Sequence, residues 1–196
     1  MTKHIEKTQQ TKEKLISAFW ELYCENKIEK ITVKAVTDKA GYYRSTFYEY
    51  FSDMYGVLEE IENSLLQKHR STMEQVLQVK DISLIKALAF SFCEENAAYL
   101  AVLLGPNGDP KFVSTVKAHI AKCIRELLHV DSSRKEIQLT LEMVSGSIIS
   151  VLLYWYQHQD TMDLQEVFDV VLKFARGGAV SLLDELDIPL PLLGYD

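Results

Sequence analysis

The amino-acid sequence predicts an all-α protein with a small N-terminal head and a larger helical body. Apolar residues recur three and four positions apart along most of the chain, which is the pattern of amphipathic helices. Alternation of apolar and polar residues, the pattern of a half-buried strand, is nearly absent. Gly and Pro, which interrupt helices, number only 8 and 4 among the 196 residues and gather at a few breaks. We therefore expect a head over residues 1–53 and a body over residues 54–196.

The head is predicted to contain three helices. The first runs from about Thr8 to Asn26 and carries its apolar residues on one stripe. Thr32 is placed to cap a short second helix, and Gly41 to end it, because glycine readily takes the left-handed conformation that follows many helices. A third short helix is expected from Tyr43 to Phe51. Two short helices joined in this way are the components of a helix-turn-helix.

The body is predicted to begin with two long helices. Ser52 or Asp53 is expected to cap the fourth helix of the chain, whose apolar residues again form one stripe. Ser83 is expected to cap a buried helix that reaches Leu104 without interruption. Both helices are rich enough in apolar residues to contribute to a core.

Three further helices are predicted to complete the body. The sequence Gly-Pro-Asn-Gly-Asp-Pro at 105–110 is a strong turn signal, with Asp109 as the N-cap of a helix that ends near His129. A long helix is expected from about Ser133 to Gln157, with apolar residues in a four-three alternation typical of coiled coils. A last helix is expected from Leu164 to about Leu186.

Composition and cysteine usage favour a cytoplasmic protein with reduced thiols. No apolar run approaches the roughly 18 uncharged residues of a membrane span, and the polar N-terminus lacks the core of a signal peptide. Cys24, Cys93 and Cys123 are widely spaced and form no CxxC pair, so neither a disulfide framework nor a zinc finger is predicted. We expect no membrane partner.

Neither an enzyme nor a metalloprotein is predicted. The sequence has no spacing typical of a nucleophile with its base, paired catalytic acids, a phosphate loop or a metal triad. His119 and Cys123 lie one helical turn apart, but two ligands without a third do not make a metal site. Cys93 has no basic cluster nearby in the sequence to lower its thiol pKa, which argues against a redox role. We expect no catalytic residues, no metal ligands and no cofactor.

The charge of the chain is distributed unevenly. The formal net charge of −7 opposes nucleic-acid binding, because phosphates attract Lys and Arg. Residues 1–55 carry 9 Lys and Arg against 8 Asp and Glu, whereas the remainder carries 12 against 20. The head is therefore the part that is not acidic, although a neutral head suits many functions.

The segment after Gly41 combines apolar anchors with a polar face. Helical spacing places Phe47 and Phe51 together as core residues. The side chains left for solvent are those of Arg44, Ser45, Thr46 and Tyr48. An Arg at the start of such a helix can donate two hydrogen bonds to guanine, and hydroxyl groups can bond to phosphates. The same spacing also fits a purely structural, aromatic-rich hairpin, and spacing alone does not separate the two.

These residues resemble the DNA-binding head of TetR-family transcriptional regulators. The resemblance rests on Ile-Thr-Val-Lys-Ala-Val and Ala-Gly within residues 31–41, and above all on Ser-Thr-Phe-Tyr-Glu-Tyr-Phe at 45–51. It covers about residues 8–66, and the helical remainder is similar in layout to the family's effector-binding and dimerisation body. The turn at 103–110 and residues 150–156 also resemble regulators of the dihydroxyacetone-kinase-activator type.

The resemblance implies a DNA-contacting surface on the second and third helices. By position, the polar side chains at the start of the third helix face bases or nearby phosphates, and Thr32 offers its hydroxyl and a helix N-terminus to a phosphate. The residues expected to contact DNA are Thr32, Lys34, Tyr42, Tyr43, Arg44, Ser45, Thr46, Tyr48 and Tyr50.

Three positions depart from the family's pattern. Many members have Ser or Thr at the position of Tyr43, a basic or aromatic residue at that of Glu49, and Lys near Met54. These departures should weaken the nonspecific attraction to phosphates. They leave room for an alternative function, a TetR-like co-regulator that acts through a protein partner without contacting DNA.

The resemblance also implies a homodimer. One recognition helix reads only a few base pairs, and pairing two heads about 34 to 36 Å apart, or at multiples of that distance, matches the repeat of the duplex. The apolar seams of the last two helices are our candidate interface, unless these faces fill the core of one chain. The expected interface residues are Ile137, Leu141, Val144, Ile148, Val151, Val171, Ala175 and Leu182.

An aromatic-rich interior is expected to bind a small-molecule effector. The candidate ligand-binding residues, which equally fit a plain core, are Phe90, Phe92, Tyr99, Tyr154 and Trp155. The resulting hypothesis is a cytoplasmic repressor that binds a palindromic operator in double-stranded DNA and is released by an unidentified effector.

Overall fold

The protein is all-α throughout the part of the chain that can be described. A computed structural model describes residues 2–78, 81–131, 133–181 and 185, and every regular element within these ranges is helical. The fold class predicted from the sequence is thus confirmed. The chain divides into two compact units, which we call the head (residues 1–65) and the body (residues 66–196).

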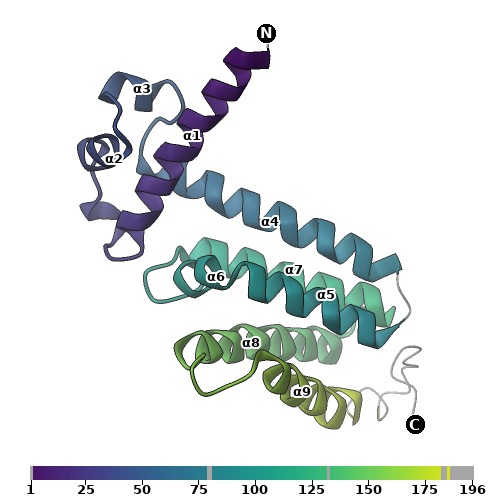
Figure 1. Ribbon diagram of the computed structural model, residues 1–196. Helices are drawn as coiled ribbons and strands as arrows, with labels where there is room; N and C mark the ends of the chain where they lie inside the picture. The colour runs from purple at the N-terminus through teal and green to yellow at the C-terminus, as the bar shows by residue number, and fades with distance from the viewer. Residues whose placement is uncertain (1, 79–80, 132, 182–184, 186–196) are drawn as a thin grey trace. The chain divides into compact units, whose positions relative to one another are not determined.

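The head consists of the long helix α1, three short helical elements and the first turns of a second long helix (Figure 1). Its elements are α1 (Thr2–Tyr23), η1 (Ile28–Lys30), α2 (Val33–Ala40), α3 (Arg44–Tyr48) and the start of α4 (Met54–Gln78). Its most deeply buried side chains are those of Leu15, Phe19, Val36, Phe47 and Val57. Because α4 contributes Val57 to this core, the head extends beyond the expected boundary at residue 53. Asp53 caps α4, with its Oδ1 accepting a hydrogen bond from the Gly56 amide at 2.9 Å.

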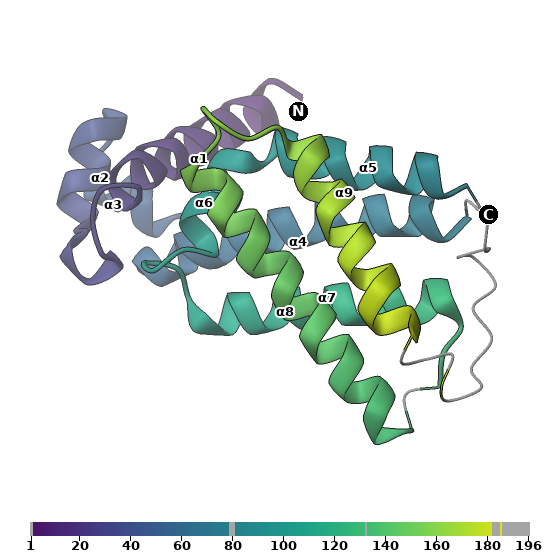
Figure 2. The same ribbon diagram turned by 90° about the horizontal axis from the view of Figure 1, so that it is seen from below.

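The body packs the remaining helices around a second core. Its further elements are α5 (Ile82–Glu95), α6 (Ala97–Leu103), α7 (Pro110–Leu128), α8 (Lys135–Gln157), α9 (Leu164–Phe174) and the π-helical η2 (Ala175–Val180). Helix α8 packs against α6 and α7 and against α9, which also packs against α5. Helices α8 and α9 therefore lie side by side as an outer layer of the body (Figure 2).

The helix expected from Ser83 to Leu104 is interrupted, and its predicted cap was wrong. The cap is Asp81, whose Oδ1 accepts a hydrogen bond from the Ser83 amide at 2.8 Å. The interruption is at Asn96, which leaves helical geometry and donates a side-chain hydrogen bond to Phe92 O at 2.8 Å. Phe92 O also accepts the Asn96 amide at 3.2 Å, so side chain and backbone of Asn96 share this carbonyl at the break between α5 and α6.

The turn between α6 and α7 was predicted correctly. Asp109 caps α7 through a hydrogen bond from the Lys111 amide at 2.8 Å, and Pro110 is the first helical residue. A Cβ added to Gly108 would lie 1.8 Å from Leu103 O, so only glycine allows this close approach of the backbone.

The two helices of the outer layer, α8 and α9, each add a detail that the sequence analysis did not include. By length and composition α8 alone among the described helices could cross a membrane, which the count of uncharged residues did not anticipate. In the body its apolar residues either pack inward or form an exposed stripe. The last helix begins at Leu164 as predicted, its regular part α9 ends at Phe174 and continues as η2 to Val180, and its expected end near Leu186 lies outside the described residues.

Candidate functional site: an exposed recognition helix and an apolar cavity

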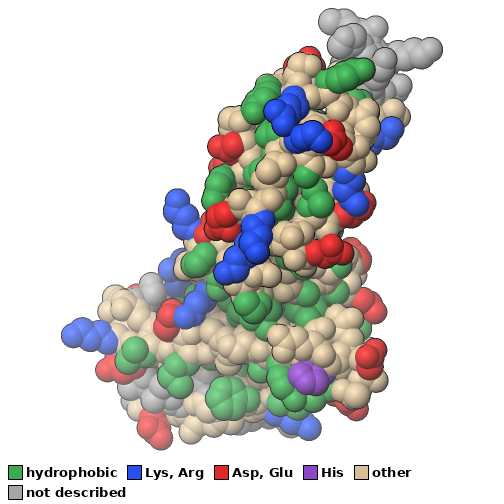
Figure 3. Space-filling view, turned by 90° about the vertical axis from the view of Figure 1, so that its left-hand side faces the viewer, with side chains coloured by type: hydrophobic (Ala, Val, Ile, Leu, Met, Phe, Trp, Pro, Cys, Tyr) green, Lys and Arg blue, Asp and Glu red, His purple; other side chains and the backbone are tan. Residues whose placement is uncertain are grey.

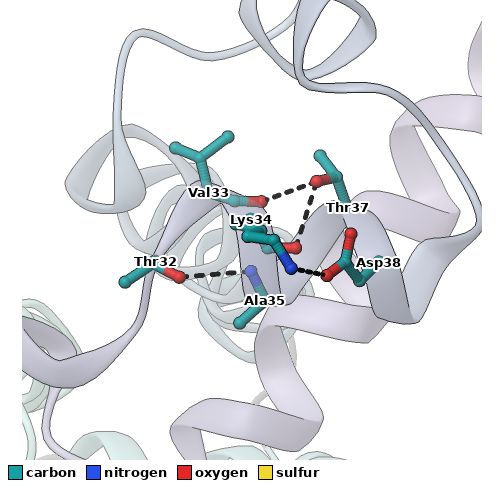
Figure 4. Close-up of polar contacts among 6 residues, drawn as sticks. All are labelled: Thr32, Val33, Lys34, Ala35, Thr37 and Asp38. Carbon is teal, nitrogen blue, oxygen red and sulfur yellow. Dashed lines mark hydrogen bonds and ion pairs between the residues drawn. The ribbon is translucent and has the colours of Figure 1, made fainter.

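Helix α2 has a defined start and a defined end. Thr32 is extended, and its Oγ1 accepts a hydrogen bond from the Ala35 amide at 3.2 Å (Figure 4). Gly41 ends the helix with φ at 76° and donates its N–H to Thr37 O. A side chain at this φ would be strained. The predicted cap and terminator are both confirmed, and together they fix the path of the chain into α3.

The polar side chains of α2 are largely satisfied within the helix itself. The Thr37 hydroxyl donates to Val33 O at 2.9 Å and lies near Lys34 O at 3.2 Å, which lets this side chain be buried (Figure 4). Lys34 pairs with Asp38 one turn later, with 2.7 Å between Nζ and Oδ2. Lys34 is therefore partly neutralised by its own helix.

Helix α3 is short and is anchored by one face. Phe47 is fully buried, Phe51 is nearly so, and their ring centroids are 5.7 Å apart. The helix ends at Tyr48, earlier than expected, because the amides of Tyr50 and Phe51 both donate to Phe47 O at 3.0 Å. The core role predicted for Phe47 and Phe51 is confirmed.

The opposite face of α3 is open to solvent. Tyr43, which precedes the helix, is 84% exposed, and Tyr48 is 60% exposed. Arg44 and Ser45 are also exposed, whereas Thr46 is half-buried. This face presents a guanidinium and several hydroxyl groups without burying any of them.

Several lysines of the head form ion pairs with carboxylates, whereas Arg44 does not within the described part of the chain. Lys12 pairs with Glu60, and Lys39 pairs with Glu21 at 2.7 Å, a hydrogen bond that raises the Lys39 pKa. Arg44 forms no ion pair with any described residue. On the side of the head that carries α2 and α3, blue Lys and Arg side chains are interspersed with red Asp and Glu (Figure 3).

The body contains a cavity of about 250 Å³. Its walls come from α4, α5, α6, α7, α8 and α9. Most of the lining is hydrocarbon, and typical lining residues are Met73, Ile85, Ile120, Ile148, Leu152 and Leu172. The polar lining residues are His69, Lys86, Cys93 and Cys123.

The polar groups around the cavity are uncharged or already paired near neutral pH. Burial, together with neighbouring His119, lowers the pKa of His69 to about 4. Burial raises the pKa of Cys93 to about 12 and that of Cys123 to about 11. The Lys86 ammonium is paired with Asp169 of α9. The cavity therefore offers no free charge to a ligand among these groups.

A stripe of apolar side chains covers the exposed side of α8 and α9. Each of them is more than half exposed although it is large and hydrophobic. This stripe, which we call the outer apolar face, consists of Leu139, Met143, Tyr154, Val170 and Phe174. Exposed apolar clusters on otherwise packed helices commonly mark protein contacts.

A family comparison identifies the body. The sequence model for the C-terminal region of TetR-type transcriptional regulators matches residues 80–177, which is half of the chain. The chain belongs to the TetR family of transcriptional regulators. In this family context the cavity and the outer apolar face both lie within the matched body, apart from the α4 side of the cavity.

Solved structures of TetR-type regulators share the fold. The fatty acid degradation regulator FadR from Bacillus halodurans is 15% identical with a TM-score of 0.66, covering 86% of this chain and 95% of its own. A TetR regulator from Streptococcus agalactiae is 22% identical with a TM-score of 0.63, over 88% and 97%. The dihydroxyacetone kinase operon activator DhaS is 15% identical with a TM-score of 0.56, over 92% and 98%. No curated protein matches the chain in sequence.

The structure of this TetR-family chain gathers the expected DNA-contacting residues on α2, α3 and their flanks. Thr32, Lys34 and Arg44 are exposed, while Tyr42 and Tyr50 are half-buried. Tyr42 follows the end of α2 and Tyr50 follows the end of α3. Whether these side chains contact DNA stays a prediction.

The expected effector-binding aromatics are dispersed in this TetR-type body. Phe92 lines the cavity, but Phe90 packs against Phe168 with 6.4 Å between ring centroids and does not line it. Trp155 is buried and donates its Nε1 hydrogen to Met162 O at 3.1 Å. The other two, half-buried Tyr99 and exposed Tyr154, also lie outside the cavity lining.

Sequence reasoning missed the aliphatic wall of the cavity on α7. Val116, Ile120 and Ile124 line it at a spacing of four residues, followed by Leu127. This regular spacing was available in the sequence, but an aliphatic stripe on a helix indicates a core as readily as a binding site. The cavity exists because several such stripes meet without filling the space between them.

The expected interface residues lie mainly on the inward side of α8 and α9. Ile137 is 1% exposed and packs with Val130, and Trp155 belongs to a core cluster against which Ile148 and Val151 pack. Leu141 packs on the Ile137 cluster, and Val144 is half-buried. Of the others, Val171 lines the cavity, Ala175 is half-buried and Leu182 lies outside the described residues.

Proposed function

We propose that this TetR-family regulator binds double-stranded DNA directly, with α3 as the recognition helix. The observation that carries the proposal is the exposed Arg44, which begins α3 without an ion pair to any described residue, while Phe47 anchors the opposite face. A free guanidinium at this point suits a bidentate contact with guanine, and the neighbouring hydroxyls suit phosphates.

A homodimer on a palindromic operator is the form that we propose for the regulator. The outer apolar face supports this proposal, because burying it between two copies would remove large hydrophobic side chains from water. Leu139, Met143 and Phe174 replace the inward-facing Ile137 and Ile148 as the proposed contacts. Two α3 helices would then read half-sites separated by about one turn of the duplex or a multiple of it.

The regulator is proposed to act in the cytoplasm as a repressor that a small molecule releases. The cavity of about 250 Å³ supports an effector site. A ligand that binds one arrangement of the body more tightly than another shifts the population toward that arrangement. Repression is relieved if the favoured arrangement moves the two recognition helices out of register with the operator.

A co-regulator that acts through a protein partner is the second candidate. Exposed Tyr43 and Tyr48, together with exposed Glu49, favour it, because aromatic side chains with a neighbouring carboxylate suit a protein surface better than a phosphate backbone. In this case Arg44 would contribute little to DNA affinity.

Arg44 separates the two candidates in a direct binding experiment. The promoter DNA beside the protein's own gene is labelled, and its affinity is measured by fluorescence anisotropy for the wild type and for Arg44→Ala. We expect Arg44→Ala to weaken binding by about tenfold or more, since one bidentate base contact contributes about 1–3 kcal/mol. Arg134→Ala, the same change in the body, should leave the affinity within about twofold.

Two outcomes would contradict direct DNA binding. Equal affinity of wild type and Arg44→Ala would remove α3 as the recognition helix. Absence of wild-type binding at low salt to this promoter and to fragments selected from the genome would favour the co-regulator. The effector proposal is tested separately, by titrating a cavity ligand into the complex, and a ligand that binds without changing DNA affinity would contradict it.

A further inference from the structure

We propose that the cavity accepts an uncharged, mainly hydrocarbon molecule of about ten non-hydrogen atoms that carries one hydrogen-bond acceptor, and that His69 donates to this acceptor through Nε2. This inference rests on the effector site proposed above and specifies its chemistry. Three observations support the proposal: the size of the cavity, the ion pair that Lys86 in its wall forms with Asp169, and the hydrogen-bond chain that leads to His69.

The volume of the cavity limits the size of the ligand. An apolar cavity of roughly 150 Å³ stays dry and holds benzene, which has six carbon atoms. By proportion, about 250 Å³ holds about ten non-hydrogen atoms. This is below the roughly 300 to 1,000 Å³ of sites for drug-sized ligands, so a large polycyclic molecule does not fit.

The charges around the cavity select against an ionic ligand. Lys86 contributes its hydrocarbon stem to the wall, and its ammonium is held by Asp169 across α5 and α9. Cys93 and Cys123 are protonated thiols at neutral pH because burial raises the pKa of each. A carboxylate in this cavity would lose its hydration without gaining a free cation, which is strongly unfavourable.

A chain of hydrogen bonds fixes the proton positions on His69. Arg70 donates from Nε to His119 Nε2 at 3.2 Å, and the guanidinium always carries this proton. The remaining proton of neutral His119 therefore lies on Nδ1, which faces His69 Nδ1 at 3.4 Å. His69 Nδ1 accepts this long hydrogen bond, so the proton of His69 lies on Nε2.

We infer that the Nε2 hydrogen of His69 faces the cavity, whose wall is otherwise mainly hydrocarbon. His69 lines the cavity, and none of the described residues forms a hydrogen bond with its Nε2. Phe92 packs against the imidazole at 5.1 Å between ring centroids and an interplanar angle of 70°, which holds the ring in place. A carbonyl or ether oxygen of the ligand would satisfy this donor, whereas a pure hydrocarbon would leave it unpaired.

Three probes of equal size and different polarity test the proposal. Propiophenone has a ketone oxygen, butylbenzene has no acceptor and phenylacetate is an anion, and each has about ten non-hydrogen atoms, the size set by the cavity. Their affinities for the full-length protein are measured by calorimetry in the absence of DNA. We expect propiophenone to bind most tightly and phenylacetate at least about tenfold more weakly.

A histidine variant identifies the donor. His69→Phe keeps an aromatic ring beside Phe92 but removes the hydrogen-bond donor. It should weaken propiophenone binding by about three- to tenfold and change butylbenzene binding by less than about twofold. His158→Phe, the same change at a histidine outside the cavity lining, should leave both affinities unchanged. A fold defect in His69→Phe would weaken both probes equally and would not mimic this selectivity.

The nitrogen chemical shifts of His69 give a second measurement. In wild type, the ¹⁵N spectrum should show a protonated Nε2 and an unprotonated Nδ1 on neutral His69. Arg70→Met removes the donor that fixes the proton of His119, so both tautomers of His69 should then be populated. Arg134→Met, a matched change elsewhere in the body, should leave the single tautomer unchanged. A protonated Nδ1 on wild-type His69 would overturn the assignment of the donor.

The remaining outcomes also decide the proposal. Tighter binding of phenylacetate than of propiophenone, or an unchanged propiophenone affinity in His69→Phe, would contradict it, and so would absence of binding by all three. Because these affinities are measured without DNA, failure here leaves Arg44 and operator binding untouched. Conversely, a result that contradicts DNA binding would not contradict the ligand chemistry proposed for the cavity.

Discussion

Helix α3 of the head and helix α8 of the body differ in the number of apolar faces that they carry. Helix α3 has one apolar side, and Phe47 on that side is fully buried while Arg44 on the other is exposed. Helix α8 has apolar residues on two sides, with Ile137 buried and Leu139, two positions later, mostly exposed. A helix with one apolar face has one way to pack, whereas a helix with two has alternatives that only its neighbours decide.

The head and the body also differ in where some of their polar side chains lie. In the head, lysines such as Lys34 and Lys39 form ion pairs at the surface, where solvent screens them. In the body, His69 is turned into the interior and held neutral. The body also carries surface ion pairs such as that of Lys117 with Glu142, so this neutral histidine in the cavity wall is what distinguishes it from the head. The four predictions below test this contrast.

The largest effect is expected from Phe47→Ala in the head. Removing a fully buried Phe side chain costs about 3–5 kcal/mol of unfolding free energy. Hydrogen exchange should show reduced protection in α1, α2 and α3, with little change in α7 and α8. Leu84→Ala, at an exposed position in the body outside the proposed dimer contacts, should cost about 1 kcal/mol or less. Uniform loss of protection would mean that the two units do not unfold separately.

The second prediction separates the two sides of α8. Ile137→Ala should destabilise the body by about 2–5 kcal/mol, because Ile137 lies in the chain's own core. Leu139→Asp should leave the fold intact and shift the proposed dimer toward monomer, because it places a charge on the outer apolar face. Analytical ultracentrifugation and thermal unfolding distinguish the two effects. A monomeric wild type at high concentration would remove the dimer from the proposal.

The third prediction concerns the acid stability of the body. The pKa of His69 is about 4 in the folded chain and 6.5 in the unfolded one, so the unfolded state binds the additional proton between these values. Stability is therefore complete above pH 6.5 and falls by up to about 3 kcal/mol as the pH decreases to 4. The unfolding free energy, measured with urea at a series of pH values, should depend less on pH in His69→Phe than in the wild type. In His158→Phe its pH dependence should equal that of the wild type.

The smallest effect is expected at the cap of α2. Thr32→Ala removes the hydrogen bond to the Ala35 amide and should cost about 1 kcal/mol in the head. Thr32→Ser should restore most of this stability because serine caps helices equally well. The comparison by denaturant unfolding would contradict the capping role if the two variants were equally unstable.

Much of the head could be predicted from its local sequence. Thr32, Gly41 and Phe47 act on neighbours within a few residues, so capping, chirality and helical spacing specify them. The break at Asn96 was missed because asparagine inside an apolar stretch gives no clear sign of whether its side chain will bond to the backbone. The cavity in the body was missed for a different reason. Phe92 lies in its wall but Trp155 does not, although both are aromatic residues in helices of the same core.

The sequence by itself determined the all-α fold class, the helix-turn-helix of the head and the exposed face of α3, because each depends on contacts between residues close together in the chain. The tertiary structure decided which side of α8 faces the core, where the cavity lies and that His69 meets His119 of another helix. These features depend on how helices distant in the sequence pack, and many apolar stripes can pack in more than one way.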